Sequence, residues 1–175
     1  MDQFSEYKDF YRPDFDPKTN PVPRPQPIDY VVSFFRGKRH GFFIDIGAFD
    51  GITWSNSLSL EKYLEWDGFG VEPSKTAADT WEKHRTSKLF RNCAWNEDGF
   101  VEFQLVTGYA EMLSGVTKAN GFNEIHKQRI ADEIKAHGGT SEFIKMPSRT
   151  VDSMLKEQGV SNVDYMSIDA EGAEL

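Results

Sequence analysis

Apolar and polar positions divide much of the chain into short buried strands and amphipathic helices. Residues 41–47 form an apolar run that ends in an aspartate and a glycine, and residues 69–73 form a second run that a proline stops. Short apolar runs between turn residues are typical of buried parallel strands. Residues 55–65 and the segment around 77–81 place apolar side chains on one helical face. This alternation predicts a parallel α/β sheet.

The pattern continues beyond these segments and then loosens. A short helix is expected over residues 28–36, and a third strand over residues 88–93. Further along, the sequence predicts a half-exposed antiparallel strand at 101–105, a charged helix at 122–138, a strand at 143–146, a helix at 151–158 between a Thr150 cap and a Gly159 stop, and a last strand at 163–169. No internal repeat is apparent.

The 175 residues suit a single domain preceded by an arm. Six of the eight prolines fall between residues 13 and 27, where they favour extended backbone. We interpret residues 1–27 as an arm that lies on the domain, with a polyproline ligand for a partner as the alternative. Residues 28–175 form the expected domain.

Charge and cysteine content narrow the function classes. A net charge of −8 disfavours non-specific nucleic-acid binding, which depends on Lys and Arg. The single cysteine, Cys93, forms no intrachain disulfide, and we expect a small buried side chain in a reducing compartment. No secretory signal pattern or stretch of about 18 apolar residues is present, so we expect a soluble, cytoplasmic protein with no membrane partner. No pattern of closely spaced Cys and His suggests a zinc site, and no metal ligand is predicted.

Three carboxylates stand at the carboxyl ends of predicted parallel strands. They are Asp45, Glu72 and Asp169. In open α/β sheets, ligands bind in the crevice outside these strand ends. For Asp169, a helix N-cap is the alternative role. If the first and last strands adjoin, Asp169 lies opposite the turn at Gly47, which predicts a shared ligand site.

The turn after the first strand distinguishes between two nucleoside ligands. A dinucleotide turn has the pattern Gly-x-Gly-x-x-Gly, but here Gly47 and Gly51 are four residues apart, and Asp45 precedes the first by two. A carboxylate repels a pyrophosphate and attracts the sulfonium and ammonium groups of S-adenosylmethionine. The turn therefore favours the methyl donor, and Glu72 is placed to accept ribose hydroxyl groups in either class.

Six segments, in order, carry a resemblance to a known family. They are FFIDIGAFDG at 42–51, SN at 55–56 through LEK at 60–62, GVEP at 70–73, MLSG at 112–115, RTVD at 149–152 and DYMSIDAEGAE at 164–174. Together they resemble the FkbM family of methyltransferases. The resemblance implies a doubly wound, Rossmann-like class I sheet that uses S-adenosylmethionine, usually to methylate a hydroxyl of a sugar or small natural product.

The resemblance also implies roles for individual residues. Asp45, Gly47 and Ala48 would line the methionine part of the donor, and Asp50 and Gly51 of the same turn belong to the donor-binding set. Glu72 would bind the ribose, and Asn92 to Ala94 would lie by the adenine. Asp169 would lie beside the methyl group. Asp169 and Glu171 are the candidates for a base that removes the acceptor proton. Either could instead bind the donor's ammonium or cap the next helix, and Glu174 is a weaker candidate.

Three further expectations concern histidines, a loop and the sheet edge. His126 and His137 lie on the charged helix, where solvated side chains are expected. Residues 109–115 are either a loop over the pocket or a structural loop. The family's seven-stranded sheet implies that the chain stops after the fourth strand and lacks the C-terminal strands. We therefore expect a homo-oligomer that covers the exposed edge.

Two other functions compete with methyl transfer. A non-catalytic module that binds the nucleoside or S-adenosylmethionine is the first alternative, because the acceptor side of the sheet is expected to be incomplete. An NAD-linked oxidoreductase is the second, and the glycine spacing disfavours it. The sequence does not identify the methyl acceptor.

Overall fold

The structure is a computed structural model and describes residues 27–174, so the interpretation of the proline-rich arm lies outside the described residues. The first half contains α1 (Pro27–Phe34), β1 (Phe42–Ile46), α2 (Leu58–Leu64), β2 (Asp67–Val71), α3 (Lys75–His84), β3 (Lys88–Phe90) and β4 (Cys93–Ala94). The second half contains β5 (Gly99–Val106), the 3-10 helix η2 (Gly108–Leu113), β6 (Gly115–Val116), α4 (Glu124–His137), β7 (Ser141–Arg149), α5 (Val151–Gln158) and β8 (Tyr165–Ile168).

The first sheet is parallel, with strand order β3-β2-β1-β8. Ile46 of β1 pairs with Val71 of β2 on one side and with Ile168 of β8 on the other. The expected adjacency of the first and last strands is therefore confirmed, and with it the parallel α/β sheet. The complete Rossmann-like order and the pairing of the β8 edge with another chain remain predictions.

Helices cover both faces of this sheet, which explains why β1 is buried almost throughout. Successive residues of a strand point to opposite faces. Phe43 lies in a core with α1, α2 and α3, whereas Ile44 lies in a second core with Met154 of α5. Both faces of β1 are therefore covered by apolar side chains, and its one polar side chain, Asp45, lies near its carboxyl end.

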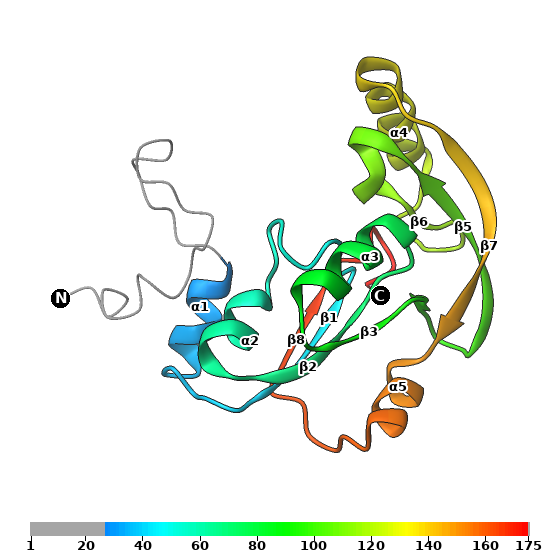
Figure 1. Cartoon of the computed structure of the whole chain (residues 1–175). Coiled ribbons are helices and arrows are strands. Elements are labelled where there is room, and N and C mark those ends of the chain that lie inside the picture. The colour runs from blue at the N-terminus through cyan, green and yellow to red at the C-terminus, as the bar shows by residue number, and fades with distance from the viewer. Residues whose placement is uncertain (1–26, 175) are drawn as a thin grey trace, which may run out of the picture.

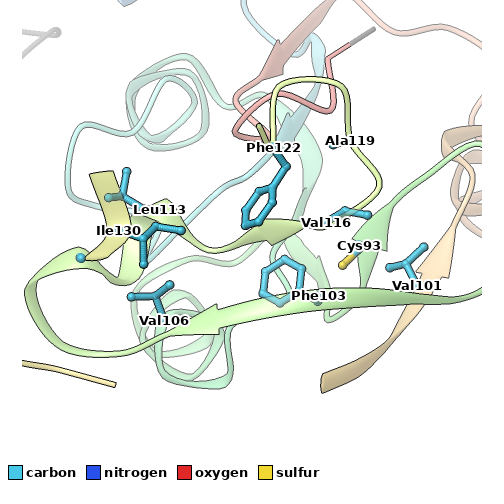
Figure 2. Close-up of a cluster of buried hydrophobic side chains, with 10 residues drawn as sticks. Cys93, Val101, Phe103, Val106, Leu113, Val116, Ala119, Phe122 and Ile130 are labelled. Carbon is cyan, nitrogen blue, oxygen red and sulfur yellow. The ribbon is translucent and has the colours of Figure 1, made fainter. Parts of the chain in front are cut away.

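The second sheet has the order β4-β7-β5-β6 and stands beside the first (Figure 1). Its two long strands, β5 and β7, are antiparallel from the Gly99–Ser148 pair to the Val106–Ser141 pair. The antiparallel strand expected at 101–105 is confirmed, and β7 is longer than the expected strand at 143–146. Figure 2 shows the core on its inner face, where Phe103 of β5 lies near Phe122, the residue just before the α4 cap.

The helix ends follow the local chemistry of the chain. The Thr150 hydroxyl accepts from the Ser153 N–H, and Gly159 ends α5 with a φ of 66°, as expected. The helix expected from residue 122 begins later, because the Asn123 side chain accepts from Ile125 N–H and caps α4. Within residues 27–174, no helix has the length and apolar character required to cross a membrane.

Candidate active site

A cavity lies where the carboxyl ends of β1, β2 and β8 face η2 and β6 of the second sheet. Most of the predicted site residues line it: Asp45, Gly47, Ala48, Glu72, Asn92, Ala94, Asp169 and Glu171. Asp50 and Gly51 do not. The fold therefore brings together residues from four separate segments of the chain that sequence reasoning assigned to one site.

Asp45 is a buried carboxylate at the end of β1. Its Oδ2 accepts a hydrogen bond from the Ser57 hydroxyl at 2.5 Å. The pKa of Asp45 is raised to about 6, chiefly by burial; Ser57 and Arg85 lower it, and nearby Asp169 acts in the same direction as burial. A cation that approaches such a buried carboxylate stabilises its ionised form.

Gly47 allows the turn after β1 to lie against the backbone of Asp169, the residue that follows β8. Its φ is 74°, and a Cβ atom built on it would stand 1.7 Å from the carbonyl oxygen of Asp169. No side chain fits in that space. Since the Asp169 N–H also donates to the Ile46 carbonyl, the two strand ends are held in contact and both border the cavity.

Glu72 follows β2 and is also buried. Its two oxygens accept from the Phe49 N–H at 2.9 Å and the Ser74 N–H at 2.7 Å. Burial raises the pKa of Glu72 to about 7 despite these hydrogen bonds, and Glu111 and Asp45 add to the rise. Each oxygen keeps a second lone pair for another donor, such as a hydroxyl group.

Arg85 is bonded to the turn that follows β1, and sequence reasoning missed it. Its side chain is fully buried and bonds Glu61 at 2.8 Å, the Gly51 carbonyl at 2.9 Å and the Ser57 hydroxyl at 3.0 Å. Its guanidinium lies over the ring of Trp81, 4.1 Å from the centroid. Through Ser57, this network positions Asp45.

Asp50 and Gly51 make contacts that stabilise the turn after β1 and do not line the cavity. The Asp50 carboxylate accepts from the Ile52 and Thr53 N–H groups at 2.8 and 2.7 Å. A Cβ atom on Gly51 would meet the Trp81 ring at 2.4 Å. Their observed contacts shape the turn, and direct contact with a donor remains a prediction for both.

The two candidate bases differ in their surroundings. Asp169 is exposed, and its carboxylate has no hydrogen bond or ion pair within the part of the chain that the structure describes. Glu171 is partly buried and faces His126, whose Nδ1 lies 3.6 Å from the Glu171 Oε2. The Glu174 carboxylate instead accepts from the backbone N–H groups of Ala170 and Gly172. Glu174 thus shapes the turn after β8.

Two expectations about neighbouring residues have clear outcomes. The His126 side chain is only 9% exposed, so its expected solvation is wrong; the core around Phe122 packs against its ring. The His137 side chain is 49% exposed. Cys93 is buried, as expected, and burial raises the pKa of its thiol to about 12.

The segment at 109–115 contributes to the cavity wall. Within it, Glu111, Met112 and Ser114 line the cavity. The Ser74 hydroxyl donates to Glu111 at 2.5 Å, which joins η2 to the start of α3. The segment therefore borders the cavity, and its role as a loop that moves over the pocket stays a prediction.

The family comparison agrees with this geometry. A family model described as the methyltransferase FkbM domain matches residues 45–175. The chain belongs to this family. FkbM methyltransferases use S-adenosylmethionine. Membership of the family therefore confirms the predicted cofactor and enzyme class. Neither the curated proteins nor the solved structures compared with the chain contain a match.

The cavity of this FkbM methyltransferase fits a cationic methyl donor. It is lined by five carboxylates and by no Lys, Arg or His among the described residues: Asp45, Glu72, Glu111, Asp169 and Glu171. In the same part of the chain, no group of three or more His, Cys, Asp or Glu could hold a metal ion. A sulfonium and an ammonium group would compensate charges that the protein itself leaves without a cation in the cavity.

Donor affinity is expected to fall in acid because the pKa values of Asp45 and Glu72 are raised to about 6 and 7. Their ionised forms suit the donor, so lowering the pH from about 8 to about 6 should weaken binding roughly tenfold. Proton release on binding near neutral pH should accompany this. Calorimetry in two buffers of different ionisation enthalpy measures both effects, and a pH-independent affinity would contradict the assignment.

The same groups affect stability with the opposite sign. Because the donor-free folded protein holds these two protons more tightly than the unfolded chain does, their contribution to the free energy of unfolding is present below about pH 4. It is lost as the pH rises through about 6 for Asp45 and about 7 for Glu72. Through these two groups alone, acid therefore stabilises the donor-free fold while it weakens donor binding.

Proposed function

We propose that this FkbM methyltransferase transfers the methyl group to an uncharged hydroxyl acceptor, such as a sugar or a small natural product. The observation that carries the proposal is the charge of the cavity wall, which among the described residues contains five carboxylates and no Lys, Arg or His. A phosphorylated, sulfated or carboxylated acceptor would meet like charge there. A neutral hydroxyl compound would not.

The cavity residues divide the work of such a reaction. S-adenosylmethionine supplies an already activated methyl group. In the proposal, Asp45 attracts its cationic groups, Glu72 accepts from its ribose hydroxyls, and the segment from Asn92 to Ala94 borders the adenine. Asp169 and Glu171 follow β8 at the same edge of the sheet, where a carboxylate is available to take the acceptor proton. Holding the two reactants in line supplies much of the rate.

Apolar side chains at the cavity support binding of a small organic acceptor. Trp54 and Met112 both line the cavity and are 84% and 52% exposed. Trp54 has a φ of 59°, a left-handed conformation that only a minority of non-glycine residues adopt. Ligand sites typically combine such apolar surface with a few convergent polar groups. We assign these two side chains to the acceptor side.

Calorimetry with S-adenosylmethionine and its demethylated product tests the donor half of the proposal. Asp45→Asn and Glu72→Gln should each weaken donor binding by roughly 30-fold or more, since each removes a buried charged group from the interaction. Asp79→Asn and Glu82→Gln on the exposed side of α3 are the matched controls and should leave binding unchanged. Failure of the intact, folded protein to bind either compound would refute the proposal.

A transfer assay with paired acceptors tests the other half. Each neutral hydroxyl compound is compared with its phosphorylated counterpart, and methyl transfer is expected only to the neutral member. Transfer to any acceptor would exclude the alternative of a non-catalytic binding module. Preference for the phosphorylated members would overturn the proposed acceptor class.

A further inference from the structure

His126 of α4 has two defined neighbours in the cavity wall. Its Nε2 lies 2.9 Å from the carbonyl oxygen of Leu113, and its Nδ1 lies 3.6 Å from the Glu171 Oε2. The two contacts come from the two sides of the ring. Glu171 lines the cavity, whereas His126 stands behind it.

These contacts determine where the protons lie. A carbonyl oxygen only accepts hydrogen bonds, so the Nε2 atom carries a proton. In a neutral ring, the Nδ1 lone pair would then face an ionised Glu171, which is repulsive. The contact between His126 and Glu171 becomes favourable when one more proton is bound than in this state, a neutral ring beside an ionised carboxylate. A cationic His126 beside an ionised Glu171 satisfies this condition.

The surrounding frame holds both side chains in place. Leu113 lies beside Ile130 of α4 in the core of the second sheet (Figure 2). The Phe122 ring centroid is 4.7 Å from that of His126. Glu171 has a φ of 49°, and the next residue, Gly172, accepts from the Gly121 N–H at 3.0 Å. The pair therefore lies between two segments that a backbone hydrogen bond joins directly beside it.

The charges around Glu171 oppose one another. Burial is the largest influence and raises the pKa of its carboxyl, and Asp169 and Glu174 act in the same direction. His126 and Arg129, both on α4, lower it. His126 and Arg129 thus counteract part of the effect of burial on this carboxyl, and His126 is the one whose ring lies 3.6 Å from it.

We propose that His126 is a positioning residue that holds Glu171 ionised and oriented toward the cavity, so that Glu171 is the base of the reaction. This rests on the proposed transfer to a hydroxyl group. In the step, the acceptor O–H bond breaks and its proton goes to Glu171. The acceptor oxygen forms a bond to the methyl carbon, and the electron pair of the broken carbon–sulfur bond stays on sulfur. Glu171 then releases the proton to water.

A carboxyl titration tests the pairing without any acceptor. The side-chain carboxyl of Glu171 is followed by carbon NMR in glutamate-labelled protein, with the signal assigned from Glu171→Gln. His126→Gln keeps a donor for the Leu113 carbonyl but removes the charge, so the pKa of Glu171 should move upward. His137→Gln is the matched control on the same helix and should leave it unchanged. An unchanged midpoint in His126→Gln would overturn the pairing.

The kinetic readout tests the base assignment. His126→Gln should lower kcat by roughly tenfold to a hundredfold, with little change in the donor Kd, and should move the pH profile of kcat to higher pH. A loss confined to KM, or an unmoved pH profile, would overturn the positioning role. If the wild-type protein methylates no acceptor while the Glu171 midpoint still moves, the proposed function fails and the His126–Glu171 pairing stands.

Discussion

Replacing Gly47 with alanine is expected to abolish donor binding and to lower the free energy of unfolding by about 2–5 kcal/mol. Two effects combine. A Cβ atom would stand 1.7 Å from the Asp169 carbonyl oxygen, and the backbone has a φ of 74°, which costs an alanine more than a glycine. Relief of the clash must separate the ends of β1 and β8, which both border the cavity proposed to hold the donor.

Gly159→Ala separates these two effects. Gly159 has a similar φ of 66°, but nothing lies within 4 Å of a Cβ atom placed there. It should therefore lose only the backbone contribution, about 1–2 kcal/mol, and bind the donor normally. Denaturant unfolding and calorimetry measure both variants. Equal decreases in the free energy of unfolding in Gly47→Ala and Gly159→Ala would show that the close approach of β1 to β8 does not contribute to stability.

Replacing Arg85 with methionine is expected to lower the free energy of unfolding by about 3–5 kcal/mol, because it leaves a largely buried Glu61 carboxylate without its cation. The variant also loses the hydrogen bonds to the Gly51 carbonyl and the Ser57 hydroxyl. Since Ser57 holds Asp45, donor affinity should fall as well, although Arg85 does not line the cavity. Thermal unfolding and donor calorimetry test the two effects.

Two variants control for this change. Arg91→Met removes a surface arginine that pairs with Asp79 and Glu82, and its effect should be far smaller. Adding Glu61→Gln to Arg85→Met should recover part of the lost stability, because the uncompensated charge is then removed. If the double variant is no more stable than Arg85→Met, the loss comes from packing against Trp81 rather than from charge.

The first sheet was predictable because its strands are nearly continuous apolar runs. Residues such as Phe43 and Ile44 are buried on opposite faces, and burial on both faces gives the continuous apolar run that predicts a buried parallel strand. The second sheet was predicted only as separate strands. β4 and β6 have two residues each, and β7 joins β5 and β4 through pairings that local pattern does not encode.

The candidate site divides along the same line. Asp45, Glu72 and Asp169 were predictable because strand ends in a parallel sheet meet at one edge. Arg85 and His126 gave no usable signal. Arg85 is a charged residue just after α3, His126 is a polar residue within α4, and only tertiary contacts bury their side chains. A charged residue that ends up buried must have a partner, and the partner is far away in sequence.

The position of β8 beside β1 has a consequence for how the protein forms. β1 pairs early in the chain with β2, but its other neighbour arrives late: the Phe42 N–H donates to Asp164, 122 residues further on. Contacts of such long sequence separation form slowly. During synthesis, Asp45 and Gly47 are therefore in place well before the strand that completes their site. For that interval, the nascent chain has an open β1 edge that only correct arrival of β8 protects.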